Sequence, residues 1–361
     1  MIIIANPESS MQPNTVPSAP TLPARVPLHL EEPGSGLNLL IIDCAGKSRA
    51  ELRGLVTETL RNHGAVLMKN TGMVEMAEMK DWADLIGSTA MEYTAGTNSR
   101  SKLGGGVLTV GTEPPFVDVA AHNEMSYSKE YCGRIMFGCL AIPSRGGATV
   151  IADNRAVTES MLATPTGQRI LREGITYIRN FYDADRPGSL PSLRSWQEAF
   201  GVDNRGELRA MCRTRSWDLE ERSDGSVRVS WTHPGYEYDP LSGSDLLFTS
   251  IGNHGVAFDG WQPYQSLPND ERPYHLTFGG GGEFSREDLD EFNRIFNEHG
   301  QPIPWEPEMV AVLDNLWWTH ARPPYELPAG EQRRIGVKIL DPVNRRGQLA
   351  QPDRQVAGSR V

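Results

Sequence analysis

Apolar residues recur at helical spacing in two segments near the start of the chain. Between Ser48 and Gly64 they stand three or four positions apart, which is the period of a helix with one buried face. Ser48 and Glu51 form a Ser-x-x-Glu capping box at the start of this segment, and Gly64 is a typical helix stop. A short apolar run at 65–68 then predicts a buried strand, and a second helical stripe ends before Gly87. We expect both helices to be scaffold, because neither carries a cluster of ionisable residues.

From about residue 105 the pattern changes to short apolar runs divided by Gly and Pro residues. Such runs favour an antiparallel β core. The predicted strands lie at 107–110, 116–121, 135–142, 149–152, 175–178, 246–248, 310–313 and 335–340. Helices are expected at 160–172 and from Ser285, where Ser285 and Asp288 resemble a second capping box. Interrupted strands with a long polar insertion, from about 180 to 216, predict a β-sandwich or jelly roll whose loops close over one end.

The two ends of the chain depart from this pattern. Residues 7–25 combine five prolines with Ser, Thr and Asn, a composition that buries too little apolar area to offset its ordering entropy. We therefore expect residues 1–25 to form a flexible leader. Residues 345–361 are polar and lack apolar periodicity, which predicts a flexible tail. A single catalytic domain is expected over 26–344.

Charge and composition exclude several classes of function. The chain has 361 residues, with 35 Lys and Arg against 46 Asp and Glu, and its formal net charge is −11 at pH 7. This acidic balance argues against binding to nucleic acid or to an anionic membrane. No apolar run approaches the roughly 18 to 20 residues of a membrane-spanning helix, so we expect neither signal peptide nor anchor. Four cysteines without a Cys-x-x-Cys pair do not make a disulfide framework, which favours a cytoplasmic location.

Two histidines and a carboxylate are candidates for a metal site. His122 and Glu124 stand two positions apart at the end of an apolar run, and on a strand such side chains point to the same side. Alone, a His-x-Glu triplet is more typical of an ordinary surface or core pair. His320, which follows the predicted strand at 310–313, supplies a second imidazole. Two histidines and one carboxylate on one face of an ion leave positions open and favour non-haem iron(II) over zinc.

Two arginines follow His320 and head the predicted strand at 335–340. A guanidinium at Arg333 or Arg334 could hold a carboxylate in a bidentate fork near the metal. Thr149, at the end of a Gly-Gly-Ala-Thr turn, could place its hydroxyl beside that carboxylate as a second donor.

These motifs together resemble the taurine dioxygenase (TauD/TfdA-like) superfamily of Fe(II)/2-oxoglutarate-dependent oxygenases. The residues that carry the resemblance are 122–124, the turn at 146–149, the segment 314–320 and Arg333-Arg334-Ile335. They occur in the order and spacing of that family, from about Leu39 to Leu340. The metal carboxylate is a glutamate where many members have aspartate, which is similar to clavaminate synthase-like and syringomycin-type hydroxylases.

The resemblance implies a fold, a set of cofactors and a set of site residues. The fold would be mainly β with flanking helices, a double-stranded β-helix (a cupin-like jelly roll) in which the 180–216 insertion forms part of a lid. The iron(II) ligands would be His122, Glu124 and His320. By the family pattern, 2-oxoglutarate would be bound by Arg334 and Thr149, with Arg333 as the alternative carboxylate partner. Dioxygen would be the second co-substrate.

The resemblance also implies a reaction. Halogenating relatives replace the metal carboxylate by a small residue, so the presence of Glu124 favours hydroxylation, with release of succinate and CO2. We expect a small polar, amino-acid-derived substrate of specialised metabolism, free or tethered to a carrier protein. Desaturation, epoxidation and cyclisation remain alternatives with the same cofactors, and a metal-binding jelly-roll protein without redox activity is the alternative of another class. Monomer and homo-oligomer both remain open.

Four residues are candidates for contact with the substrate. Arg100 lies in a polar loop just before the strand that carries His122. Asn123 and Tyr127 flank the metal carboxylate, and Lys338 lies four residues after the arginine pair on the next strand. The family resemblance does not identify the substrate itself, because the run Gly279–Gly282 stands where many relatives have Gly-Asp-Gly. His254 and His275 are expected to pack in loops and strands rather than to bind ligands.

Overall fold

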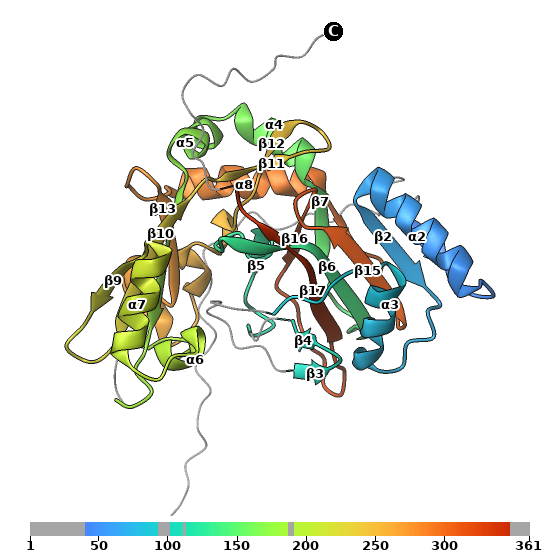
Figure 1. The fold of residues 1–361 in the computed structure, drawn as a ribbon, viewed down its shortest axis with the longest axis horizontal. Coiled ribbons are helices and arrows are strands. Elements are labelled where there is room, and N and C mark those ends of the chain that lie inside the picture. Colours follow the sequence, from blue (N-terminus) through green and yellow to red (C-terminus); the bar gives the residue numbers. More distant parts are fainter. Residues whose placement is uncertain (1–39, 93–101, 111–112, 187–190, 347–361) are drawn as a thin grey trace, which may run out of the picture.

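The computed structural model describes residues 40–92, 102–110, 113–186 and 191–346, and its largest sheet has seven strands (Figure 1). In order across the sheet they are β1 (Ile41–Asp43), β2 (Ala65–Lys69), β15 (Met309–Asp314), β6 (Glu130–Ala141), β17 (Arg334–Asn344), β4 (Val107–Thr109) and β3 (Lys102–Gly104). Neighbouring strands are antiparallel except for the parallel pair β1 and β2. The sheet therefore joins the beginning of the described chain to its end.

A four-stranded antiparallel sheet packs against the inner face of this sheet. Its strands, in order, are β14 (Gly300–Pro302), β7 (Val150–Asp153), β16 (Trp318–Arg322) and β5 (Val119–His122). One buried cluster contains Phe137 of β6 and Val337 of β17 together with Ile151 of β7, so it fills the space between the two sheets. Two facing antiparallel sheets are the arrangement of a jelly roll. The prediction of a mainly β fold with flanking helices is confirmed.

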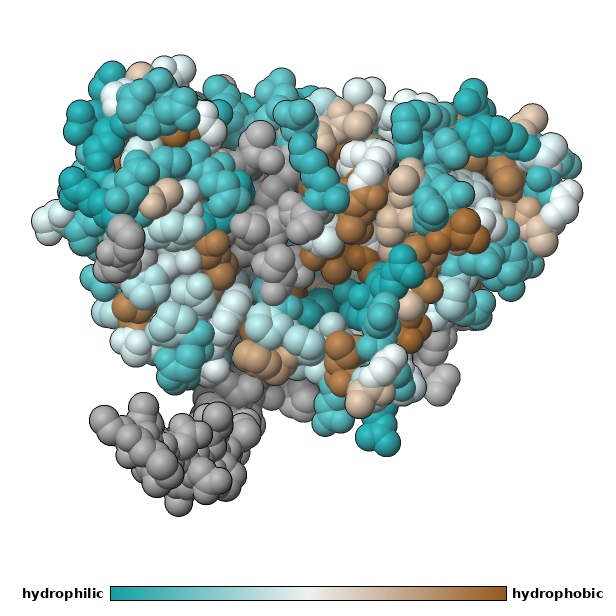
Figure 2. All heavy atoms as spheres, turned by 90° about the horizontal axis from the view of Figure 1, so that it is seen from below, coloured by the Kyte–Doolittle hydropathy of each residue, from teal (hydrophilic) through white to brown (hydrophobic). Residues whose placement is uncertain are grey.

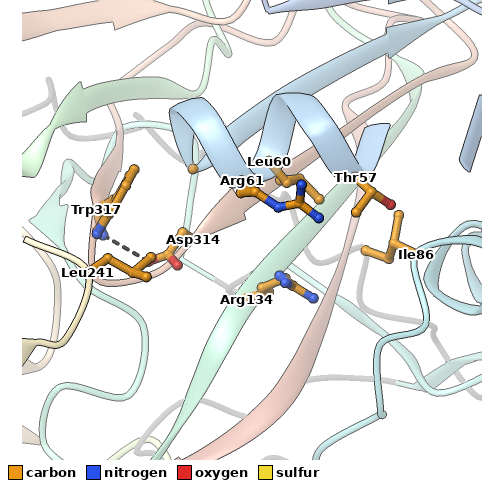
Figure 3. A pocket seen from close by; sticks show the side chains of 9 residues that line it. Thr57, Leu60, Arg61, Ile86, Arg134, Leu241, Asp314 and Trp317 are labelled. Carbon is orange, nitrogen blue, oxygen red and sulfur yellow. Dashed lines mark hydrogen bonds between the residues drawn. The ribbon is translucent and has the colours of Figure 1, made fainter. Parts of the chain in front are cut away.

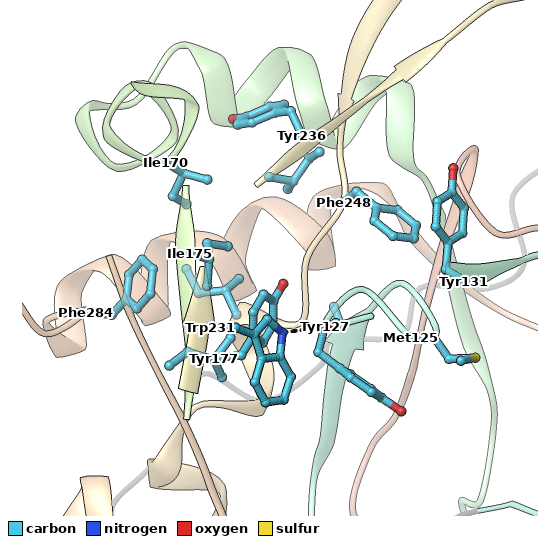
Figure 4. Close-up of a cluster of buried hydrophobic side chains, with 14 of the residues drawn as sticks. Met125, Tyr127, Tyr131, Ile170, Ile175, Tyr177, Trp231, Tyr236, Phe248 and Phe284 are labelled. Atoms are coloured by element: carbon cyan, nitrogen blue, oxygen red, sulfur yellow. Dashed lines mark hydrogen bonds between the residues drawn. The ribbon is translucent and has the colours of Figure 1, made fainter. Parts of the chain in front are cut away.

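A further four-stranded sheet forms the other half of the molecule. It consists of β13 (Tyr274–Phe278), β8 (Ile175–Phe181), β10 (Val227–His233) and β9 (Asp218–Glu221), and a hairpin of β11 (Tyr236–Asp239) and β12 (Ser244–Leu247) lies apart from it. The largest buried cluster packs Tyr177 and Trp231 of this sheet against residues of the surrounding helices, such as Ile170 (Figure 4). The described parts of the polar insertion at 180–216 form α6 (Trp196–Phe200) and α7 (Arg205–Arg215), beside β9 and β10 in Figure 1.

Two helical segments cover the outer face of the large sheet, at the right of Figure 1. They are α2 (Arg49–His63) and α3 (Met79–Leu85), the latter preceded by the 3-10 turn η1 (Met76–Glu78). The predicted capping box of Ser48 and Glu51 is present. Gly64 ends α2 in the left-handed conformation with φ +67°, and a Cβ there would lie 2.7 Å from the Trp317 ring. Local sequence signals thus fix both ends of α2.

The helix predicted at 160–172 is two helices. They are α4 (Asn154–Leu162) and α5 (Pro165–Glu173). The Thr164 side chain accepts a hydrogen bond from the Gly167 amide and caps α5, while Pro165 occupies the first turn, where its missing N–H costs nothing. The prediction of one helix was wrong because a Thr-Pro pair starts a new helix at this point. α8 (Arg286–His299) begins at Ser285 with the expected capping box.

Four short 3-10 turns lie between β12 and β13. They are η2 (Ile251–Asn253), η3 (Gly255–Phe258), η4 (Tyr264–Ser266) and η5 (Asn269–Glu271). Folded structure continues past the predicted boundary at 344, because Arg345 is buried and its Nε donates to Glu237 Oε2 at 3.2 Å. The predicted leader at 1–25 and the rest of the tail, 347–361, lie outside the described residues.

The surface seen from below is mostly polar, with a smaller group of apolar side chains (Figure 2). Large apolar residues exposed in the described chain include Leu103, Phe116 and Leu327. None of the helices in the described ranges has the length and apolar character required to cross a membrane.

Candidate active site

The pairing of β5 with β16 places two predicted ligands side by side. His122 and His320 are direct partners in the antiparallel register, and the centroids of their rings lie 4.2 Å apart. Glu124 Oε2 lies 4.0 Å from His320 Nε2. One ligand atom from each of the three residues falls within 4.8 Å of the others, so the structure brings the predicted triad together.

Glu124 reaches this position by a turn rather than by strand alternation. β5 ends at His122, and Met125 adopts a positive φ of 58°. The expectation that His122 and Glu124 share one side of a strand was therefore wrong in its mechanism. Both residues arrive at the same point because the chain turns immediately after the strand.

Asn315 holds this turn from the segment between β15 and β16. Its Oδ1 accepts a hydrogen bond from the Glu124 amide at 2.8 Å, and its Nδ2 donates to the carbonyl oxygens of Glu124 and Cys132, each at 2.9 Å. The side chain is fully buried. The sequence motif contained Asn315, but its role was missed because no local pattern reveals a bond that spans 191 positions.

Asn123 is a second support of the same turn. Its Nδ2 donates to the Asn315 carbonyl at 2.8 Å, and its Oδ1 accepts from the Thr249 amide at 3.1 Å. The residue is fully buried. Asn123 was predicted as a contact for the substrate, but its amide is used to join three chain segments.

The donor atoms of the triad fit a non-haem iron centre. His122 Nδ1 lies 2.9 Å from the Ala120 carbonyl oxygen, so Nδ1–H donates there and Nε2 keeps its lone pair for a metal. Glu124 and His320 are 4% and 5% exposed, while His122 is half-buried. Two imidazoles and one carboxylate are the donor set that suits Fe(II) with open positions for co-substrates.

Arg333, rather than Arg334, lies inside the jelly roll with Thr149. Arg333 Nε donates to the Gly147 carbonyl at 2.8 Å, and its Nη2 lies 3.5 Å from Thr149 Oγ1. Arg334 is exposed at the start of β17. Arg333 directly precedes β17, which has a register shift between Arg334 and Ile335, so its contacts with Gly147 and Thr149 are what place its side chain. Of the two arginines, the structure therefore places the alternative one, Arg333, beside the predicted hydroxyl.

The charged side chain of Arg333 is half-buried. Burial, together with the positive charge of Arg322, lowers the pKa of Arg333 to about 10, so the guanidinium remains charged at neutral pH. Thr149 is 4% exposed, and its Oγ1 accepts a hydrogen bond from Trp305 Nε1 at 3.0 Å. A half-buried cation beside a hydroxyl is suited to binding a carboxylate.

Lys338 lies on the opposite face of β17 and does not reach this interior. Its Nζ donates to the Gly105 carbonyl at 2.5 Å, and Lys80 and Asp84 of α3 are the charges that act on it. Lys338 and the arginine predicted to bind 2-oxoglutarate do share a face, but that face is the outer one. The prediction that Lys338 contacts the substrate is thus contradicted by the strand's alternation.

Tyr127 adjoins a buried cation that the sequence analysis missed. Arg179 of β8 is 4% exposed, and its Cζ lies 5.1 Å from the centre of the Tyr127 ring, 5.5 Å from Tyr274 and 5.8 Å from Tyr177. The signal that could have found it is that Arg179 is the one charged residue of the strand 175–181. Arg100, the fourth predicted substrate contact, lies outside the described residues.

A cavity of about 280 Å³ lies next to α2, at the end of β15 where Asp314 directly precedes Asn315 (Figure 3). Its walls come from α2, β6 and the segment after β15, and the residues are Thr57, Leu60, Arg61, Gly64, Ile86, Arg134, Leu241, Asp314 and Trp317. Burial raises the pKa of Asp314, although the amides of Trp317 and Leu316 donate to it. None of the triad residues lines this cavity, so it is not the predicted metal site.

Comparison with known families decides the class of the protein. The sequence model of the "Taurine catabolism dioxygenase TauD, TfdA family" matches residues 41–338. The chain belongs to the TauD/TfdA family of dioxygenases. It is therefore an oxidoreductase that uses Fe(II), 2-oxoglutarate and O2, as the motifs predicted. This excludes the alternative of a jelly-roll protein without redox activity.

The individual relatives of this TauD-like chain have low sequence identity to it. The dapdiamide synthesis protein DdaC of Enterobacter agglomerans is 27% identical over 292 residues, which cover 80% of this chain and 85% of that protein. A clavaminate synthase-like protein of Arabidopsis thaliana is 27% identical over 272 residues, covering 74% and 80% of the two chains. Among solved structures, PvcB of Pseudomonas aeruginosa matches with 14% identity and a TM-score of 0.45, covering 83% of this chain and 84% of that chain.

Proposed function

We propose that this dioxygenase hydroxylates a C–H bond of a small, polar, amino-acid-derived substrate in specialised metabolism, and that succinate and CO2 are released. The observation that carries the proposal is the presence of the triad and of the Arg333–Thr149 pair on elements that line the same interior. The ring of Phe137 lies 5.4 Å from His320, and Phe137 packs in the same cluster as Ile335 of β17. A chelated 2-oxo acid needs both parts: a metal at one end and a cation at the other.

His122, Glu124 and His320 are proposed as the iron ligands. Bound there, Fe(II) supplies the activation of O2 that couples oxidative decarboxylation of 2-oxoglutarate to oxidation of the substrate. The protein's own task is positioning: Ala120 fixes the tautomer of His122, and Asn315 fixes the turn that presents Glu124.

Arg333 and Thr149 are proposed to hold the distal carboxylate of 2-oxoglutarate. The Thr149 oxygen accepts from Trp305, so its own hydroxyl hydrogen is available to a bound carboxylate. The guanidinium of Arg333 has five N–H donors, and the contacts to Gly147 and Thr149 leave others for the ligand. Arg334 is not needed in this scheme.

Arg179 and Tyr127 are proposed to bind the carboxylate of the substrate. Arg179 is a buried cation among three tyrosine rings, and Tyr127 lies three residues after Glu124. Segment 180–216, which begins at the end of β8, is proposed to act as part of a lid over this side. The relative named for dapdiamide synthesis supports a role in specialised metabolism.

The proposal is tested by incubating the iron-loaded protein with 2-oxoglutarate, O2 and a panel of amino acids, both free and loaded on carrier proteins. Succinate formation stimulated by one panel member, with a product that gains one oxygen atom, is the expected result. A product that loses two hydrogens would replace hydroxylation by desaturation. The absence of stimulation by every amino-acid-derived compound, in a protein that still forms succinate slowly, would contradict the substrate class.

A further inference from the structure

A second group of two histidines and one carboxylate lies outside the triad. His254 joins η2 to η3, His275 lies on β13, and Glu283 follows the glycine run after β13. Glu283 Oε2 lies 2.8 Å from His275 Nε2 and 3.4 Å from His254 Nε2. The three ligand atoms lie within 4.8 Å of one another, and the two ring centroids are 4.3 Å apart.

The glycine run explains how Glu283 reaches the histidines. Gly281 and Gly282 have φ values of +92° and +91°, a conformation that side-chain-bearing residues rarely adopt. The Gly281 amide donates to the Phe278 carbonyl at 2.9 Å, and the Phe278 amide donates to the Gly282 carbonyl at 3.1 Å. This tight turn sends the chain back along β13, where Glu283 pairs with Thr277.

The two imidazoles are buried, although not all of their ring nitrogens have hydrogen-bond partners. His254 and His275 are 1% and 0% exposed. Within the part of the chain that the structure describes, His254 Nε2, which faces Glu283, has no hydrogen-bond partner, while the unpartnered Nδ1 of His275 lies beside Gly255. Both side chains converge on a single carboxylate whose own side chain is 58% exposed. A buried imidazole nitrogen without a hydrogen-bond partner is rare in native proteins, and a metal ion between His254 and Glu283 would satisfy it.

We propose that His254, His275 and Glu283 form a second metal site, which takes a divalent transition ion of the Zn²⁺ type. Zinc bonds to imidazole nitrogen and carboxylate oxygen are about 2.0–2.1 Å long, so neighbouring ligands of a tetrahedral ion stand about 3.3 Å apart. The distances from Glu283 Oε2 to the two imidazole nitrogens, 2.8 and 3.4 Å, bracket that value. The exposed side of Glu283 leaves the fourth position open to water.

The charges around the cluster are compatible with a cation. Burial, with smaller contributions from the neighbouring His275 and Arg272, lowers the pKa of His254 to about 3, and burial also lowers the pKa of His275. Both imidazoles are therefore neutral at pH 7 and need lose no proton to bind a metal. The charge of Arg272 is balanced by Asp259, whose Oδ1 accepts from it at 2.8 Å. The Val256 amide donates to His254 Nδ1 at 3.4 Å. Metal binding through Nε2 would place the imidazole proton on Nδ1, so this weak hydrogen bond would be lost.

A metal at this site would stabilise η2, the segment that packs against β5. A Cβ on Gly252 of η2 would lie 2.7 Å from the Ala120 Cβ, so η2 packs directly on β5. Thr249, just before η2, exchanges two hydrogen bonds with Asn123. Through these contacts the second site would connect β13 to the turn that carries Glu124. The inference is independent of the proposed reaction and substrate.

The test is a count of bound zinc in the full-length chain with the first site removed. In the His122→Ala/His320→Ala double variant, equilibrium dialysis against Zn²⁺ is expected to leave one ion per chain. Adding Glu283→Gln should weaken Zn²⁺ binding about tenfold or more, because a ligand is lost, while the exposed residue leaves the fold intact. Glu287→Gln, a change of the same kind four positions along at the exposed start of α8, should leave Zn²⁺ binding unchanged.

A second measurement does not rely on the double variant. Co²⁺ titration of the otherwise unaltered apoprotein, followed by visible absorption, should proceed in two phases, and the Glu283→Gln variant should lose one of them. The proposal is overturned if the double variant retains no Zn²⁺ and the Co²⁺ titration has a single phase. It is equally overturned if Glu283→Gln and Glu287→Gln bind metal alike.

Discussion

The Asn315 side chain forms hydrogen bonds with both the backbone N–H and the backbone carbonyl of Glu124. The Asn315 Oδ1 accepts from the Glu124 amide at 2.8 Å, and its Nδ2 donates to the Glu124 carbonyl at 2.9 Å. Because β5 ends at His122, this contact determines where the carboxylate lies. Asn315 is thus a positioning residue for the metal site, although it contacts no proposed reactant.

Replacing Asn315 should weaken the metal site more than it weakens the fold. Asn315→Ala removes three buried hydrogen bonds, so we expect the free energy of unfolding to fall by about 2–4 kcal/mol. Fe(II) affinity should fall by about 10- to 100-fold, as for other residues that orient ligands. Anaerobic Fe(II) titration and urea unfolding measure the two effects. An Asn315→Ala protein with normal Fe(II) affinity would show that these hydrogen bonds do not position Glu124.

Substitution of Arg333 and of Arg334 should have different effects on the KM for 2-oxoglutarate. Hydrogen bonds to charged groups contribute about 1.5–3 kcal/mol, so Arg333→Gln should raise the KM for 2-oxoglutarate by about 10- to 150-fold. Arg334→Gln should leave that KM unchanged, because Arg334 is exposed. Succinate formation against 2-oxoglutarate concentration measures both. The reverse order would return the carboxylate to Arg334, as the family pattern had predicted.

Arg179 and Lys338 should likewise differ in their effect on the substrate. Once the panel has identified a substrate, Arg179→Gln should raise its KM by about 10-fold or more, since a buried cation is lost. Lys338→Gln should alter only stability, because Lys338 lies on the outer face of β17 near Gly105. A raised KM for the substrate in Lys338→Gln, with no change in Arg179→Gln, would refute the assignment.

His233 should make the fold sensitive to acid. Burial, with the positive charges of Arg345 and Lys129, lowers the pKa of His233 to about 3. Below about pH 6.5 the unfolded chain binds a proton that the folded chain refuses, so stability is full above that pH and is lost as the pH falls, by about 1.4 kcal/mol per unit.

The measurement is urea unfolding of the metal-free protein at pH 7.5 and pH 5.0. Over that interval His233→Gln should lose about 2 kcal/mol less stability than the unaltered protein, because only about 1.5 of those pH units lie below the unfolded pKa. Equal losses in the two proteins would mean that His233 is not the group that titrates.

The parts of the fold that the sequence predicted are those with local signals. Ser48, Glu51 and Gly64 lie within one helix, and their spacing alone determines where α2 begins and ends. The Thr164-Pro165 pair was an equally local signal, and it divides the helix predicted at 160–172. Local sequence signals are therefore sufficient to determine where these helices begin and end.

The sequence identified the individual metal-ligand candidates, but not the contacts that bring them together. His122 and His320 lie far apart in sequence, and their pairing depends on the register of β5 with β16. The choice between Arg333 and Arg334 turned on which face of β17 points inward, next to a register shift that sequence does not reveal. The contact of Asn315 with Glu124, and the convergence of His254 with His275, are likewise products of tertiary packing.

The central claim is that one interior holds iron at the triad and 2-oxoglutarate across the metal and Arg333. It is tested most directly by an anaerobic visible spectrum recorded after addition of Fe(II) and then 2-oxoglutarate. The account predicts a metal-to-ligand charge-transfer band in the unaltered protein, no band in His122→Ala, and a higher 2-oxoglutarate requirement for the band in Arg333→Gln. A folded protein that binds Fe(II) but gives no band, or a His122→Ala variant that keeps it, would contradict the account.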